Sequence, residues 1–181
     1  MVALNYQADD HSMYLQRGLF SDNGGCGYLL KPHCLRDNAG LFDPRVRVYA
    51  HGKHVELHII SGQHLPKENE CDIVDPYVRV TTRGIECDST KHSTPPVRNN
   101  GLNPLWNYRI YLDISCPELC VIAFRVRDAD RSSFLGQACF PLAGLQSGYR
   151  HIKLRAKKGD YIHGTLFVHF QIEDFVKDAL S

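Results

Sequence analysis

A strict alternation of apolar with more polar side chains constrains the fold of this chain more than any other feature. It runs from Trp106 to Ile114 and returns from Leu166 to Ile172. Successive side chains of a β-strand point to opposite faces, so a period of two marks a strand with one buried face. Further strands are expected at 55–60, 76–82, 85–90, 121–127, 134–142 and 149–154, separated by turn residues.

Eight short strands with no long helical pattern between them predict a mainly β domain, an eight-stranded antiparallel β-sandwich. Trp106 is in phase with the apolar residues of its strand and is expected in the core. The first 33 residues differ, because residues 13–20 predict two helical turns that end at Asn23-Gly24-Gly25. We expect this segment to have no packing partner of its own, and residues 34–53 to form a linker.

Charge and hydropathy exclude several classes of function. The 181 residues carry 21 Lys and Arg against 20 Asp and Glu, a net charge of +1, so no bulk electrostatic binding to nucleic acid is expected. The longest apolar run, residues 119–124, is far shorter than the roughly 18 residues of a membrane-spanning helix. The first ten residues lack a basic leader and an apolar core, so a cytoplasmic location is expected.

The cysteines indicate reduced thiols rather than a disulfide framework or a zinc site. Their number is odd, and no Cys-x-x-Cys pair occurs. Cys116 and Cys120 form the closest pair, but no histidine or second pair lies at zinc-ligand spacing, so both are expected to be small buried hydrophobes.

Several sequence motifs together resemble phosphoinositide-specific phospholipase C. The stretches MVALNYQ (1–7) and NGGCGYLLKP (23–32) are similar to the close of that family's catalytic TIM-type barrel. The C2 domain that follows the barrel is resembled by LHIISGQHLP (57–66), IVDPY (73–77), NNGLNPLW (99–106), FLGQ (134–137) and GYRHI (148–152). The resemblance implies a barrel remnant at 1–33, a linker at 34–53, a C2 domain at 54–175 and a tail at 176–181.

In this family the intact enzyme cleaves phosphatidylinositol 4,5-bisphosphate to diacylglycerol and inositol trisphosphate, using calcium. Its catalytic groups come from barrel segments that precede the part matching Met1, so the resemblance assigns no catalytic residue here. We therefore expect the 181-residue chain alone to be inactive and to have the rest of the barrel as its partner. Two alternatives stay open: a C2 module of an inactive phospholipase-like inositide-binding or adaptor protein, and a free C2 module.

Four polar residues near predicted strand ends are candidates for a metal site. Asp128 and Asp130 follow one strand, Asp75 precedes another, and Asn99 lies in a turn. Calcium prefers six to eight oxygen ligands from such groups, although on spacing alone turn chemistry is the preferred explanation of Asp at these positions. The resemblance to the C2 domain matches all four to calcium ligands and adds the backbone carbonyl of Ile73.

The loop after Asp130 departs from the family pattern. It is short, Ser133 stands where an acidic ligand is common, and Arg131 adds a competing positive charge. Weak calcium affinity is therefore expected. The implied role is calcium-dependent binding to an anionic phospholipid membrane surface, with peripheral membrane association.

Histidines and basic clusters receive plainer interpretations. His54 and His58 share one strand face with Glu56 and are expected to be solvated, and His151 is expected to point outward. Residues 153–158 hold a basic cluster that predicts a solvated face. A second basic cluster comprises Arg79, Arg83 and Lys91 and is left open as a contact for anionic headgroups.

Overall fold

The structure is a computed structural model that describes residues 5–7, 11–32, 35–36, 43, 45, 51–67 and 73–176. Eight strands dominate these ranges, as the alternation predicts. Their bounds are β1 (His51–Gln63), β2 (Pro76–Arg83), β3 (Lys91–Ser93), β4 (Leu105–Ile114), β5 (Val121–Asp128), β6 (Phe134–Pro141), β7 (Gly148–Arg155) and β8 (Tyr161–Val176).

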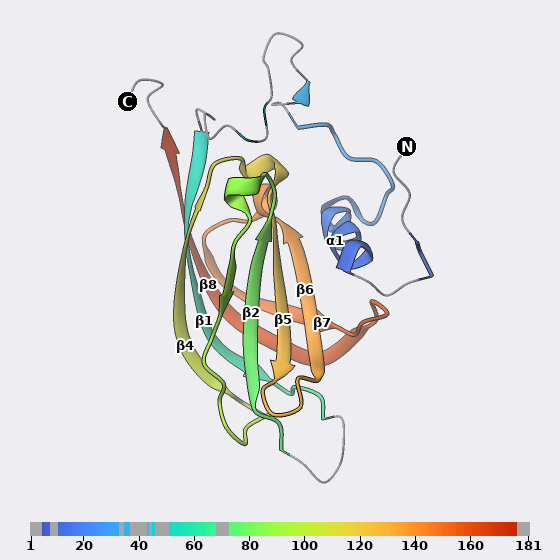
Figure 1. Ribbon diagram of the computed structural model, residues 1–181, viewed down its shortest axis with the longest axis vertical. Coiled ribbons are helices and arrows are strands. Elements are labelled where there is room, and N and C mark those ends of the chain that lie inside the picture. Colours follow the sequence, from blue (N-terminus) through green and yellow to red (C-terminus); the bar gives the residue numbers. More distant parts are fainter. Residues whose placement is uncertain are drawn as a thin grey trace.

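The strands form an antiparallel β-sandwich, which confirms the predicted fold class. They follow the order β3-β2-β5-β6-β7-β8-β1-β4 in one hydrogen-bonded sheet that folds over on itself. Figure 1 shows β2, β5 and β6 in front of the strongly curved β1 and β8. The two halves meet between β6 and β7, whose only ladder pair joins Gln137 and Arg155.

The apolar side chains of the alternating segments fill the space between the two layers. The core includes Leu57, Phe124 and Phe170, none of which is exposed. Trp106 has the predicted phase, but it lies at the edge of the core and is only partly buried. Its indole N–H donates to the carbonyl of Pro76 at 3.0 Å, and its ring covers Gly62, where a Cβ would lie 2.9 Å from the indole.

The predicted strand at residues 85–90 is wrong. A 3-10 turn occupies Glu86–Asp88, and the next strand begins only at Lys91. The cause is Asp88, whose buried carboxylate accepts the backbone N–H groups of Ser115 and Cys116 at 2.8 and 2.7 Å. Because this side chain turns inward, the backbone leaves the extended strand conformation that the neighbouring apolar residues predicted.

The expectation that the N-terminal segment has no packing partner is also wrong. Helix α1 (His11–Leu19) lies against β5 and β6, with Met13 and Tyr14 exposed by only 2% and 6%. The Tyr14 hydroxyl donates to the backbone carbonyls of Phe124, at 2.9 Å, and Ala138. Gly18 permits the close approach, because a Cβ there would lie 2.4 Å from the Sγ of Cys139.

The rest of the N-terminal segment is less enclosed. Leu29 and Leu30 are 41% and 80% exposed, as expected of apolar residues outside the sandwich. Val2 and Leu4 lie outside the described residues, as does most of the predicted linker at 34–53. Among the described helices, none is long and apolar enough to cross a membrane.

Candidate functional site

Three loops at one end of the sandwich bring the predicted calcium ligands together around Asp75. This residue directly precedes β2 and is 8% exposed. Its Oδ1 accepts the backbone N–H of Asn99 at 2.6 Å, and its carbonyl accepts the N–H of Ala129 at 2.9 Å. Asn99 itself adopts a left-handed backbone conformation with φ of 51°, which its short polar side chain tolerates. Asp75 therefore joins the loop at 99 to the loop that follows β5.

Asp128 completes this junction from the end of β5. It is 3% exposed, and its Oδ1 accepts the backbone N–H groups of Asp75 at 3.1 Å and Asp130 at 3.3 Å. No hydrogen bond from another described residue reaches the Oδ2 atom of Asp75 or Asp128. Each carboxylate thus holds the loops through Oδ1, and its Oδ2 accepts no hydrogen bond from the described residues.

The remaining candidates are nearby but do not close a coordination shell. Asp130 and Asn99 are exposed, and Ile73 is 50% exposed on the approach to Asp75. Within the described ranges, no three His, Cys, Asp or Glu side chains are arranged to hold a metal ion. The residues present therefore fit a cation only in part. Asp75 and Asp128 offer two buried carboxylates with available oxygens, but a complete coordination shell would need further ligands.

The loop after Asp130 has its own restraints. Arg127 donates through Nη2 to the carbonyl of Ser132 at 2.5 Å, and Ser132 has a φ of 54°. The Ser133 hydroxyl is buried without a hydrogen-bond partner. Because a serine stands here in place of an acidic ligand, position 133 contributes no negative charge to the loop. The neighbouring guanidinium of Arg127 also opposes a cation there.

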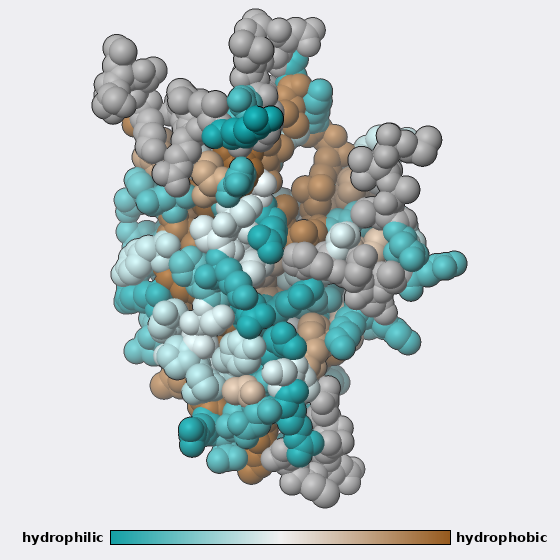
Figure 2. Space-filling view, viewed as in Figure 1, coloured by the Kyte–Doolittle hydropathy of each residue, from teal (hydrophilic) through white to brown (hydrophobic). Residues whose placement is uncertain are grey.

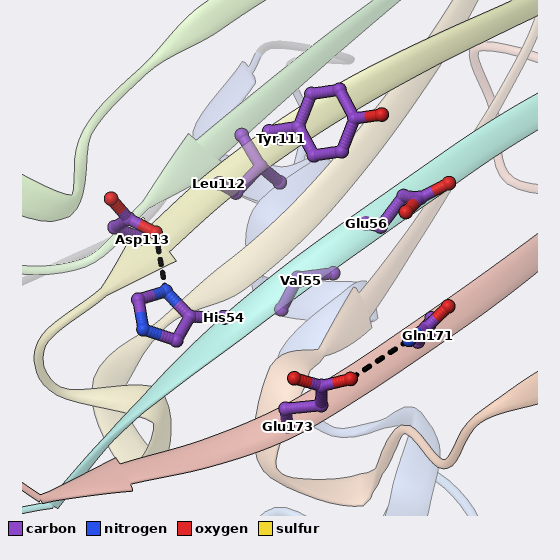
Figure 3. A pocket seen from close by; sticks show the side chains of 8 residues that line it. All are labelled: His54, Val55, Glu56, Tyr111, Leu112, Asp113, Gln171 and Glu173. Carbon is purple, nitrogen blue, oxygen red and sulfur yellow. Dashed lines mark hydrogen bonds and ion pairs between the residues drawn. The ribbon is translucent and has the colours of Figure 1, made fainter.

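The predicted solvated face of β1 is confirmed. On the outside of β4, β1 and β8, a shallow pocket of about 270 Å³ lies among polar side chains (Figure 3). His54 contacts the Asp113 carboxylate at 2.6 Å through Nδ1, and Arg109 pairs with Glu56. His58 contacts the Asn107 side chain at 2.6 Å. These pairs cross neighbouring strands in the pattern of an ordinary exposed sheet face, and no Ser, Thr, Cys or Lys lies among the described residues that line the pocket.

His151 is exposed, as predicted, and stacks on Phe167 at 4.7 Å between ring centroids. The basic cluster that the sequence leaves open as a contact for anionic headgroups lies partly on one surface. Arg79 of β2 is paired with Ser93 of β3, and Lys91 of β3 is paired with Thr81, two residues further along β2. Cys116 and Cys120 are buried, 4% and 1% exposed, in agreement with the predicted apolar role.

Sequence reasoning missed Asp88, the residue that shapes the turn before β3. It is fully buried, and its partners lie 27 and 28 residues further along the chain. An acidic residue between hydrophobic ones gives no local sign of such partners. Its role is to hold backbone amides, so it is a structural group rather than a second metal ligand.

Comparison with models of known protein families identifies the family to which this fold belongs. The family model for the C2 domain matches residues 53–155, more than half of the chain. The chain belongs to the C2 domain family. The model for the Y domain of phosphatidylinositol-specific phospholipase C matches residues 1–34, so barrel end and C2 domain occur in the order that the sequence motifs predict. The two matches together are similar to the corresponding part of phosphoinositide-specific phospholipase C.

Individual relatives agree with this assignment. The C2 chain is 42% identical, over 96% of its length, to human 1-phosphatidylinositol 4,5-bisphosphate phosphodiesterase delta-1, and 41% identical, over its whole length, to bovine delta-4. It spans about a quarter of the length of each (24%). The crystal structure of PLC21 from L. pealei matches 99% of the chain with a TM-score of 0.88 at 34% identity, and the chain covers 24% of it.

Proposed function

We propose that this chain provides the C2 domain and adjoining barrel end of a phosphoinositide phospholipase C that acts in lipid signalling. The observation that carries the proposal is the continuous match of barrel end and C2 domain to the delta phosphodiesterases. The parent protein would cleave phosphatidylinositol 4,5-bisphosphate with groups that lie outside the segment matched here. The described residues contribute a scaffold and a membrane-facing loop set.

The loop set would bind calcium and anionic phospholipid together. Asp75 and Asp128 supply buried carboxylates with available Oδ2 atoms, and Asp130, Asn99 and the carbonyl of Ile73 supply the remaining oxygens. A bound divalent ion reverses the local sign of charge, so lipid phosphate or carboxylate then completes its shell. The half-exposed Ile73 side chain adds an apolar contact at the same edge.

Substitution of the two aspartates after β5 tests this function directly. Asp128→Asn with Asp130→Asn removes two charges, yet Oδ1 at 128 remains an acceptor for the N–H groups of Asp75 and Asp130. We expect wild-type protein to sediment with phosphatidylserine-containing vesicles only when calcium is present, at concentrations of about 10⁻⁵–10⁻³ M. The double variant should stay in the supernatant with its melting temperature in EDTA unchanged or raised.

A matched control is Asp113→Asn, which removes an exposed carboxylate paired with His54 on the outer sheet face. It should keep the calcium response of the wild type. Absence of any calcium-dependent sedimentation by the wild type would mean that the three loops are only turns. Equal sedimentation with neutral phosphatidylcholine vesicles would refute the role of anionic lipid.

The alternative of an inactive adaptor parent is not favoured. Human inactive phospholipase C-like protein 1 is 40% identical to the chain over 95% of its length, but the chain covers only 17% of that protein. The human delta-1 and bovine delta-4 phosphodiesterases match at higher identity, 42% and 41%, and the chain covers a larger share of each, 24%. Assay of the parent protein for calcium-dependent release of inositol trisphosphate separates the two.

A further inference from the structure

The seam between the two halves of the sandwich opens into a groove with a cavity volume of about 890 Å³. It arises because β6 and β7 are paired only at Gln137 and Arg155 and separate beyond that point. Helix α1 forms one wall, and Arg17 bounds one end, donating to the carbonyl of Lys157 at 3.4 Å. Figure 2 shows a group of apolar side chains at the upper right of the molecule, beside the N-terminal segment. Ligand sites commonly have volumes of roughly 300–1,000 Å³.

The groove combines an apolar floor with a cationic rim. Core residues reach its floor, among them Phe140, Ile152 and Phe170. Four arginine and lysine side chains also line it, whereas no aspartate or glutamate does so among the described residues. Such a surface is complementary to a molecule that is apolar along most of its length and negatively charged at one end.

Arg150 marks the position of that negative end. Along β7 its side chain shares the inward-facing side with the buried residues Ile152 and Leu154, whereas its sequence neighbours Tyr149 and His151 are exposed. Its Nη2 donates to the carbonyl of Gln146 at 3.1 Å, but its buried Nε–H has no hydrogen-bond partner. A buried donor on a charged group is costly to leave unpaired, and a carboxylate or phosphate oxygen would satisfy it.

We propose that this groove, named the β6–β7 seam, binds a single-chain anionic lipid, with its acyl chain along the apolar floor and its head at Arg150. The apolar floor favours an alkyl chain over an acidic peptide, since a peptide would leave backbone polar groups without partners there. The β6–β7 seam is distinct from the loops at Asp75 and Asp128, so lipid binding in it needs no calcium.

Equilibrium dialysis of the 181-residue chain with labelled dodecanoate, in EDTA and below the concentration at which dodecanoate aggregates, tests the proposal. We expect saturable binding of one molecule per chain, and dodecanol, which lacks the charge, should compete poorly. Arg150→Gln should weaken binding by about tenfold or more. Leu145→Gln, which makes the apolar lining polar, should weaken it as well. EDTA separates this result from the calcium-dependent function proposed above.

The matched control is Arg79→Gln. Arg79 is also half-buried with a buried, unpartnered Nε, but it lies on β2 outside the groove, so this variant should bind like the wild type. Arg150→Lys keeps the charge and should bind better than Arg150→Gln, provided that melting temperatures show all variants folded. Equal affinity of wild type and Arg150→Gln would overturn the proposal, and so would full competition by inorganic phosphate. Light scattering that shows a dimer lost in Arg150→Gln would also overturn it and assign the groove to a second copy.

Discussion

Replacement of Tyr14 by alanine measures how firmly helix α1 is attached to the sandwich. The ring is 6% exposed, and Arg125 of β5 lies 5.3 Å from its centroid. Deletion of a large buried aromatic side chain costs about 3–5 kcal/mol of unfolding free energy. We expect a loss of about 3 kcal/mol, the lower end of that range, because a nine-residue helix at the surface can shift to fill part of the cavity.

Urea unfolding of the 181-residue chain, followed by circular dichroism, gives the free energies to compare. Tyr14→Phe keeps the ring but removes the donor to Phe124 and Ala138, so it should cost about 1 kcal/mol. Tyr28→Ala is the matched control, since this tyrosine of the same N-terminal segment is 87% exposed and should change stability by no more than about 0.5 kcal/mol. A Tyr14→Ala protein as stable as the Tyr28→Ala protein would refute the packing of α1.

Three further predictions concern the sandwich itself. Asp88→Ala should cost about 3 kcal/mol in urea unfolding, because two buried backbone donors lose their acceptor, whereas Asp88→Asn should cost less. Trp106→Ala should also cost about 3 kcal/mol by the same assay, and a near-neutral result would mean that the ring does not pack on the core. Burial raises the pKa of Cys120 and of Cys139 to about 12, from an ordinary value of 9.0. The unfolded chain therefore ionises first as pH rises from 9 to 12, so stability should fall across that window, and at pH 8 exposed Cys26 should react with a thiol reagent much faster than either.

Local periodicity was sufficient to predict most of the sandwich. Alternation places a strand and its buried face at once, so seven of the eight predicted segments coincide with strands, and the phase of Ile110 and Leu112 is right. The same rule failed at residues 85–90. That turn is determined by the hydrogen bonds from the backbone N–H groups of Ser115 and Cys116 to the Asp88 carboxylate. These groups come together only when the chain folds, so a local pattern does not predict their pairing.

The packing of α1 escaped prediction for the same physical reason. Tyr14 hydrogen-bonds to carbonyls 110 and 124 residues away, and the small Gly18 matters only because Cys139 lies opposite. Arg150 is a further case, since alternation assigns it to the inward side of β7 but does not show that β6 has separated from β7 there. Sequence patterns thus report which face is buried, whereas the partners that complete a site come from distant segments.

The two interpretations of the aspartates, turn chemistry and calcium binding, are compatible in this geometry. Asp75 and Asp128 use Oδ1 to fix the loops through backbone amides, which leaves Oδ2 of each available. Loops held in this way before an ion arrives lose less conformational entropy when it binds. The proposed calcium site should therefore respond chiefly by a change in local charge and by recruitment of Asp130, with the backbone at 75 and 128 kept in place. The hydrogen bonds from backbone N–H groups to Oδ1 at position 128 do not require a negative charge. Asparagine at 128 should therefore preserve the loops while removing the attraction for the cation.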